Sequence, residues 1–253
     1  MFNFFSRSKG ADQLWFETDI HCHVIPGVDD GCPDADTSVE VLGRMHDLGL
    51  RRVIASPHVT EVTFENDRST LEPAYQTLKE RMKDDAGLAG MELFYSSENR
   101  IDGLFTDNFE KGNLITVPVN DEKYLLIENA FMQEPWDLDN LIFQMQVRGY
   151  SPILVHPERF IYYHENPERL ARLHTAVPFQ INVLSLAGYY GKHIRKFAES
   201  LMDKGFVDYL GTDIHNVRHT ESIAEYLKSS QSARDARALS GIRNDIVFGA
   251  AVS

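Results

Sequence analysis

Short apolar segments alternate along the chain with longer segments in which apolar residues recur at helical spacing. Leu42, Met45 and Leu48 show this spacing, which places them on one face of a helix. Gly49 and Gly149 each come shortly before an apolar segment, where a glycine is typical of the end of a helix. We expect β-strands at residues 16–21, 52–56, 92–96, 124–128, 153–156, 179–183 and 207–211.

The repeated order of strand and then helix predicts an α/β fold. A helix between consecutive strands returns the chain to the same edge of a sheet, so the strands are parallel. Seven such units without interruption favour closure into a barrel over an open sheet. At 253 residues, and with no linker or sequence repeat, the chain fits a single domain, which we place at residues 16–253.

Residues 1–15 are expected to form a flexible amino-terminal tail. The apolar residues of this tail come before its basic ones, which is the wrong order for a signal peptide. An alternative role is weak docking to a membrane or a partner through Phe2, Phe4 and Phe5. No segment of the chain approaches the roughly 18 apolar residues of a membrane span.

The chain is acidic, with a formal net charge of −13, and 43% of its residues are hydrophobic. The charge argues against a general nucleic-acid binder, because phosphate backbones attract basic surfaces. A small phosphorylated substrate remains open, since it feels the local field of bound cations and arginines. With only Cys22 and Cys32 there is no disulfide framework, so we expect a reducing, cytoplasmic location.

Histidines and acidic residues gather where the expected strands end. In a parallel barrel these ends share one rim, the face at which catalytic loops lie. Residues two apart on a strand point to the same side, so we expect His21 and His23 to face inward together, and likewise Asp213 and His215. The rim residues are His21, His23, Asp30, His58, Glu98, His156, Asp213 and His215.

The convergence of these residues predicts a metal site. One histidine at a strand end is usually only a polar loop residue, but a set supplied by several strand ends in one register indicates ligands. The remaining histidines are not expected to bind metal: His46, His174 and His193 fall in helical patterns, and His164 and His219 in loops.

The mixture of ligand types narrows the choice of metal and of reaction. Imidazole and carboxylate without thiolate favour manganese, iron or zinc over magnesium or calcium. Cys22 lies between two inward-facing histidines, so we expect it to point outward and pack against the helices. Eight ligands exceed what one ion accepts, so two or three bridged ions are expected. Such ions hold the attacking and leaving oxygens of a displacement and bring the pKa of bound water from about 15.7 toward about 7, which predicts a phosphoric-ester hydrolase.

Arg159 lies three residues after His156, one of the rim residues. A guanidinium at the rim would bind phosphoryl oxygens through paired hydrogen bonds. The alternative is a surface ion pair with Glu158 or Glu165.

Several motifs in this order resemble those of the PHP (polymerase and histidinol phosphatase) superfamily. Within that superfamily the chain is similar to the manganese-dependent protein-tyrosine phosphatases of bacterial capsule and exopolysaccharide operons, over residues 18–220. The resemblance implies a distorted (β/α)7 barrel with a trinuclear metal site. The motifs that carry it are Asp19-Ile-His-Cys-His23, Val24-Ile-Pro-Gly-Val-Asp-Asp-Gly31, Ser56-Pro-His58, His156-Pro-Glu-Arg-Phe160, Gln180-Ile-Asn182 and Gly211-Thr-Asp-Ile-His-Asn216.

The resemblance also assigns roles to individual residues. It makes the eight rim residues the metal ligands, with Glu98 as the bridging carboxylate, and makes Arg159 the phosphate-binding arginine. Glu128 matches a position near the active site, with a role as an acid or as a supporting partner. The implied substrate is phosphotyrosine on a bacterial tyrosine kinase that controls capsule or exopolysaccharide production.

The chain departs from the family pattern at two places. After Glu98 the family tends to have aromatic residues, whereas Asn99 and Arg100 follow here, and Arg100 would add a phosphate contact or change the choice of substrate. The second arginine of the family has no clean match, and Arg218 is the nearest candidate. Aromatic residues that could line the rim, or equally pack in the core, are Phe160, Tyr162, Tyr163, Tyr189 and Tyr190.

The sequence therefore predicts a metal-dependent protein-tyrosine phosphatase that hydrolyses phosphotyrosine with a metal-bound hydroxide. Mn²⁺ is the expected ion, with iron or zinc as alternatives. Three rival functions remain: a small-molecule phosphatase of the histidinol-phosphate type, a PHP exonuclease, which the acidic charge disfavours, and a non-catalytic, metal-stabilised partner of a kinase.

Overall fold

The structure is a computed structural model that describes residues 12–249. Residues 1–11, which make up most of the expected tail and include Phe2, Phe4 and Phe5, lie outside the described residues. Leu14 is buried in the core, and its backbone N–H donates to the carbonyl of Leu48 over 2.8 Å. No helix in residues 12–249 is long and apolar enough to cross a membrane.

All seven expected strands form, each within a few residues of its expected bounds. The strands are β1 (Thr18–Asp19), β2 (Arg52–Ala55), β3 (His58–Val59), β4 (Glu92–Tyr95), β5 (Glu98–Arg100), β6 (Val117–Val119), β7 (Glu122–Glu128), β8 (Tyr150–Val155), β9 (Phe179–Asn182) and β10 (Tyr209–Gly211). Strands β1, β2 and β4 pair in parallel, and so do β3, β5, β7, β8, β9 and β10, while β6 adds an antiparallel hairpin to β7.

The two runs of strands close into a barrel where the first strand meets the last. Cys22 forms an isolated parallel bridge with Ile214. The N–H of Asp213 donates to the carbonyl of His21 over 2.8 Å, and the N–H of His23 donates to the carbonyl of Ile214 over 2.9 Å. The expected α/β barrel with parallel strands is therefore confirmed, and the link between its first and last strands is short.

Two of the expected strands are each broken into two pieces near their carboxyl ends. The second breaks between β2 and β3 at Ser56 and Pro57, and the third breaks between β4 and β5 at Ser96 and Ser97. Proline has no N–H to give to a neighbouring strand, which explains the first break. The pairing resumes beyond both breaks, so the residues that follow them remain at the rim.

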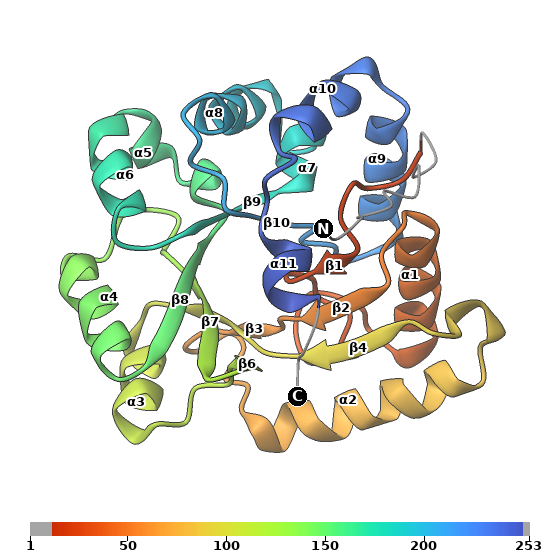
Figure 1. Ribbon diagram of the computed structural model, residues 1–253. Coiled ribbons are helices and arrows are strands. Elements are labelled where there is room, and N and C mark those ends of the chain that lie inside the picture. The colour runs from red at the N-terminus through yellow and green to blue at the C-terminus, as the bar shows by residue number, and fades with distance from the viewer. Residues whose placement is uncertain (1–11, 250–253) are drawn as a thin grey trace, which may run out of the picture.

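The helices surround the strands (Figure 1). They are α1 (Ala35–Asp47), α2 (Arg68–Lys83), α3 (Gly103–Lys111), α4 (Leu138–Val147), α5 (Ile161–His164), α6 (Pro167–His174), α7 (Val183–Ala187), α8 (Lys192–Asp203), α9 (Val217–Leu227), α10 (Ser230–Ala238) and α11 (Asn244–Phe248), with 3-10 turns at Ala86–Leu88 and Pro157–Arg159. His164 and His219 thus lie in α5 and α9, and the expectation that they lie in loops was wrong.

Helix α11 packs at the amino ends of the strands, opposite the rim of interest. The backbone N–H of Thr18, at the start of β1, donates to Oδ1 of Asp245 over 2.8 Å. The buried amide of Asn244 donates to the carbonyls of Thr18 and Leu210, and it accepts from the N–H of Leu210. Three backbone groups of two strands are satisfied by one side chain, which fixes this end of the barrel.

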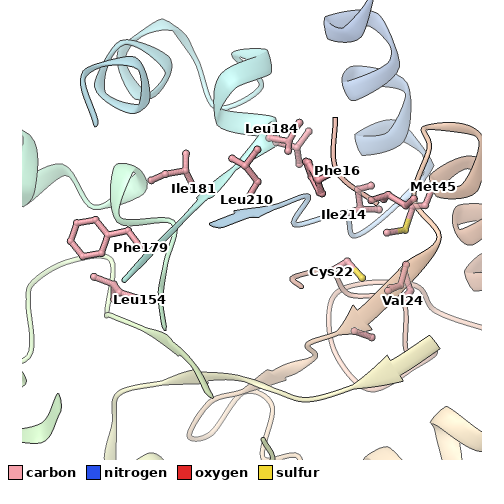
Figure 2. Packing of buried hydrophobic residues seen from close by; sticks show 14 of the residues in the cluster. Phe16, Cys22, Val24, Met45, Leu154, Phe179, Ile181, Leu184, Leu210 and Ile214 are labelled. Carbon is pink, nitrogen blue, oxygen red and sulfur yellow. The ribbon is translucent and has the colours of Figure 1, made fainter. Parts of the chain in front are cut away.

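Apolar side chains between the strands and the helices form the main core (Figure 2). Cys22 is fully buried among them, together with Val24, Met45 and Ile214. Burial, reinforced by the nearby negative charge of Asp19, raises the pKa of the Cys22 thiol well above its usual value. The interpretation of Cys22 as a packing residue is therefore confirmed.

Candidate metal centre

The eight rim residues predicted from the sequence converge at the carboxyl ends of the strands. In the described part of the chain, four overlapping groups of side chains have potential ligand atoms within 4.8 Å of one another. His21, His23, His58 and Glu98 each belong to two of the groups, so the groups form one cluster. The groups are His23, Asp30, His58 and His215; His21, Glu98 and His156; His21, His23 and Asp213; and His58, Glu98 and Glu128.

A relay of amide groups fixes the orientation of His21. Asn182 Nδ2 donates to the carboxylate of Asp213 over 2.6 Å, and Gln180 Nε2 donates to Asn182 Oδ1 over 2.9 Å. The remaining Gln180 oxygen can then only accept, and it lies 2.7 Å from Nδ1 of His21. Nδ1 therefore carries a proton, and a neutral His21 presents the lone pair of Nε2 to the cluster.

Asp29 orients His23 in the same way. The Oδ2 atom of this buried carboxylate lies 2.8 Å from Nδ1 of His23 and also accepts from the backbone N–H of His58 over 3.1 Å. A carboxylate that accepts from one ring nitrogen leaves the other free to bind a cation, as is common beside metal-binding histidines. The Nε2 atoms of His21 and His23 face each other at 3.3 Å.

Glu98 lies in the middle of the imidazoles. Its Oε2 atom is 2.9 Å from Nδ1 of His58, 3.3 Å from Nε2 of His21 and 3.4 Å from Nε2 of His23. None of these approaches has the geometry of a hydrogen bond, so this buried oxygen is unsatisfied. Its other oxygen lies 2.8 Å from Nε2 of His156.

The outer edge of the cluster is more open to solvent. Asp30 Oδ1 lies 3.5 Å from the Nε2 atoms of both His58 and His215. The loop that carries Asp30 turns back tightly, because a Cβ at Gly31 would lie only 2.1 Å from the carbonyl oxygen of His23. Glycine is therefore required for Asp30 to reach this position.

Two of the clustered residues have a left-handed backbone. His156 has a φ of 35° and Asp213 a φ of 54°, a region that non-glycine residues rarely occupy. Such strain of roughly 1–3 kcal/mol persists only when surrounding contacts hold it, and it is typical of functional sites. At Asp213 the contacts are hydrogen bonds from Asn182, Arg159 and Tyr190 to Oδ2.

The electrostatics of the cluster favour added positive charge. Burial disfavours a charged imidazole, yet the carboxylates of Glu98 and Asp213 raise the pKa of His21 to about 9. Against its own burial, Glu98 is surrounded by His21 and His58, which hold its pKa well below the usual value. Facing ring nitrogens and an unsatisfied carboxylate oxygen are what divalent cations require, so the residues present fit a metal site.

A pocket of about 400 Å³ opens above the cluster. This volume is within the range of sites for small ligands. Arg159, Arg100 and Glu128 all line it, together with Phe131 and Tyr190. The three residues predicted to act on the substrate therefore share one pocket with the outer metal-site residues.

Arg159 does not form the ion pair that was its alternative role. Its Nη1 donates to Oδ2 of Asp213 over 2.9 Å. Glu158 instead is buried and accepts from the N–H of Asn182 and the hydroxyl of Ser185. Burial raises the pKa of Glu158 to about 7, and these two hydrogen bonds oppose the rise.

Glu128 pairs with Arg100 at the wall of the pocket. Nε of Arg100 donates to Oε2 of Glu128 over 3.1 Å, while the other oxygen of Glu128 lies 3.8 Å from Nε2 of His156. Burial and the negative charge of Glu98 raise the pKa of Glu128 to about 7, although His58, Arg100 and Arg159 oppose the rise.

Part of the site was not predicted from the sequence. Asp29 lies within one of the motifs, but its role in orienting His23 was not predicted. Of the aromatic residues expected to line the rim or to pack in the core, Tyr190 lines the pocket and donates to Asp213, whereas Phe160 and Tyr163 pack in the core. Arg218 borders a different cavity, which residues of α9 line together with Gly188 and Arg195. The residues that line the pocket without having been predicted are Thr60, Thr63, Phe64, Phe131, Asn216 and His219.

The sequence is similar to proteins of capsule synthesis. A family model described as "Capsular polysaccharide synthesis, CpsB/CapC" matches residues 17–237. Tyrosine-protein phosphatase YwqE of Bacillus subtilis is 34% identical over 202 residues, which cover 79% of this chain and 78% of that protein. Tyrosine-protein phosphatase CpsB of Streptococcus agalactiae is 26% identical over 211 residues, which cover 79% of this chain and 83% of that protein.

The fold is also similar to that of a solved structure. The match has a TM-score of 0.73 and 30% sequence identity, and it covers 90% of this chain and 94% of that chain. That structure belongs to a set of crystal structures of YwqE from Bacillus subtilis and CpsB from Streptococcus pneumoniae, which are described as unique metal-dependent tyrosine phosphatases.

The central position of Glu98 gives the first testable prediction. Glu98→Gln removes the negative charge that faces several imidazoles. Loss of a residue that only hydrogen-bonds to a metal ligand typically lowers metal affinity by roughly 10–100-fold, and loss of Glu98 should lower it by more. Elemental analysis and calorimetric metal titration measure this. The matched control is Glu92→Gln. Glu92 begins β4, the strand before β5, and its replacement removes only an ion pair with Arg52 at the surface. Full metal occupancy in Glu98→Gln would contradict the role of Glu98.

Proposed function

The chain belongs to the CpsB/CapC family of capsular polysaccharide synthesis, and from this premise we propose that it hydrolyses phosphotyrosine in a protein substrate at the rim of its barrel. It is a metal-dependent protein-tyrosine phosphatase, as the motifs had predicted. The observation that carries the proposal is the unsatisfied Oε2 of Glu98 among three imidazoles, at the base of a pocket that Arg159 lines.

We assign the metal ions to the predicted rim residues. Two or three ions are proposed because the eight residues, in four overlapping groups, exceed the ligands that one ion accepts. Mn²⁺ is the proposed ion, because a mixture of imidazole and carboxylate suits it better than it suits Mg²⁺. When bound, divalent ions would polarise the phosphoryl group and make the attacking water more acidic. The proposed ligands are His21, His23, Asp30, His58, Glu98, His156, Asp213 and His215.

Arg159 is proposed to bind the phosphoryl oxygens. Its guanidinium carbon lies 4.4 Å from the ring centre of Tyr190 and 5.0 Å from that of Phe131, so two aromatic faces hold it in place. Within residues 12–249, one of its nitrogens is hydrogen-bonded to Asp213, which leaves its other N–H groups to donate to a phosphate. These donors would stabilise charge that develops on the oxygens during the reaction.

Glu128 and Arg100 are proposed to act on the other side of the substrate. Tyrosine is a poor leaving group, since its phenol has a pKa of about 10, and a proton donor therefore helps its departure. Glu128 lines the pocket and is the acid best placed to hold that proton. Arg100, paired with Glu128, is proposed as a second contact to the phosphate.

The proposed substrate is a phosphotyrosine-bearing protein, and a tyrosine kinase that controls capsule or exopolysaccharide production fits the family. The family description names capsule synthesis, and the relatives are named tyrosine-protein phosphatases. Turnover on a phosphotyrosine peptide should exceed turnover on histidinol phosphate, and the reverse order would favour a small-molecule phosphatase.

Metal removal separates this chemistry from the cysteine-dependent route to phosphotyrosine hydrolysis. Chelation should abolish turnover on a phosphotyrosine peptide, and Mn²⁺ should restore it better than Mg²⁺. The double variant Cys22→Ser with Cys32→Ser should keep most of the activity, because both thiols are buried and have raised pKa values, to about 12 for Cys32. A folded, metal-loaded double variant without activity, or full turnover after chelation, would refute the metal-dependent mechanism.

Replacement of Arg159 tests the phosphate contact. Arg159→Ala should lower kcat by roughly 10²–10³-fold, the effect of losing a donor to developing charge. Metal content should remain near the wild-type value, since Asn182 and Tyr190 still hold Asp213. Arg148→Ala, which removes an exposed arginine paired with Glu110, is the matched control and should retain activity. Near-normal kcat in Arg159→Ala would contradict the assignment.

A further inference from the structure

Large apolar side chains are exposed in the segment between β7 and α4, residues 129–137, which we call the β7–α4 loop. The exposed fraction is 91% for Met132 and 96% for Trp136. Methionine and tryptophan are enriched where proteins bind other proteins, and tryptophan often supplies much of the binding energy. Two such side chains in one loop therefore indicate an interaction surface.

Hydrogen bonds from two side chains hold the β7–α4 loop against the body of the protein. The hydroxyl of Tyr162 donates to the carbonyl of Ala130 over 3.2 Å. Nε of Arg169 donates to the carboxylate of Glu134 over 2.8 Å, and Nη1 of Arg169 donates to Asp139 over 3.0 Å. The exposed side chains are thus presented by an anchored segment, which reduces the entropy lost when a partner binds.

The surface is continuous with the substrate pocket. Phe131 precedes Met132 and lines the pocket, with 39% of its surface exposed. Its ring is stacked against that of His156 at 6.1 Å and lies next to the guanidinium groups of Arg159 and Arg100. Phe131 therefore places the β7–α4 loop at one edge of the pocket, beside the position of a bound phosphotyrosine.

We infer that the β7–α4 loop is the docking surface for the protein substrate, and that Met132 and Trp136 contact apolar side chains close to the phosphotyrosine. The inference rests on the proposed function and goes beyond it by naming what the enzyme selects in its substrate. Apolar neighbours are selected because Phe131, which lines the pocket, and the exposed Met132 that follows it are apolar and uncharged. Specificity of this kind acts mainly on KM, since the contacts are equal in the ground state and the transition state.

The test compares two phosphotyrosine peptides of equal length and charge, one with leucine and phenylalanine beside the phosphotyrosine and one with serine and glycine. The wild-type enzyme should favour the apolar peptide by about tenfold in kcat/KM, which corresponds to the loss or gain of one good apolar contact. The double variant Met132→Ala with Trp136→Ala should lose this preference through a higher KM. Hydrolysis of p-nitrophenyl phosphate should stay unchanged, because this small ester fits within the pocket.

A matched control is Ile246→Ala. Ile246 is 76% exposed, but it lies on α11 at the opposite end of the barrel. This variant should keep the peptide preference of the wild type.

Other outcomes would overturn the inference. An unchanged preference in the double variant would overturn it while leaving the proposed function intact. Equal losses on both peptides and on p-nitrophenyl phosphate, together with reduced self-association in sedimentation, would show that the surface binds a second copy of the chain instead. Hydrolysis of p-nitrophenyl phosphate but of neither phosphotyrosine peptide by the wild-type enzyme would overturn the proposed function and this inference with it.

Discussion

Negative charge concentrated in a buried, imidazole-rich cluster is the constraint on which the rest of the site depends. Glu98 and Asp213 are buried at the barrel rim. His21 and His23 beside them are oriented by Gln180 and Asp29, which accept from the Nδ1 atom of each ring. Burying a carboxylate costs several kcal/mol unless positive charge compensates it. Only cations, whether protons or metal ions, can satisfy the facing lone pairs, so the fold has built a site that remains incomplete without them.

The barrel supplies the precision that such a site needs. At the breaks at Ser56–Pro57 and Ser96–Ser97 the chain passes from the three-stranded sheet to the larger sheet, where His58 pairs with Glu98. The link between the first and last strands places the residues of both at one rim. The left-handed backbone of Asp213 is held by hydrogen bonds from Arg159 and Asn182 to its carboxylate, and that of His156 by the hydrogen bond from its N–H to the carbonyl of Gln180. The proposed substrate contacts are arranged around this base, with Arg159 held between two aromatic rings and by Asp213 itself.

Much of the fold could be predicted because the spacing of apolar residues indicates each strand and helix, and the repeated order of strand and helix makes the strands parallel. Each strand end is visible in the sequence, and parallel pairing brings the ends together whatever the detailed geometry, so the convergence of His21, Glu98 and His215 followed. The strand breaks, the role of Asp29 and the position of Phe131 could not be predicted in this way. They depend on contacts between side chains of loops that are far apart in the sequence, and the spacing of residues along the chain does not indicate such contacts.

We propose that divalent ions bind among the eight predicted rim residues. Anomalous X-ray diffraction from crystals equilibrated with Mn²⁺ would show this, because it locates the metal without reference to activity. Two or three anomalous peaks are expected at bonding distance from the clustered imidazoles, with Glu98 in contact with more than one of them. Manganese peaks only elsewhere on the protein, or a rim without any peak in crystals of the active enzyme, would contradict it.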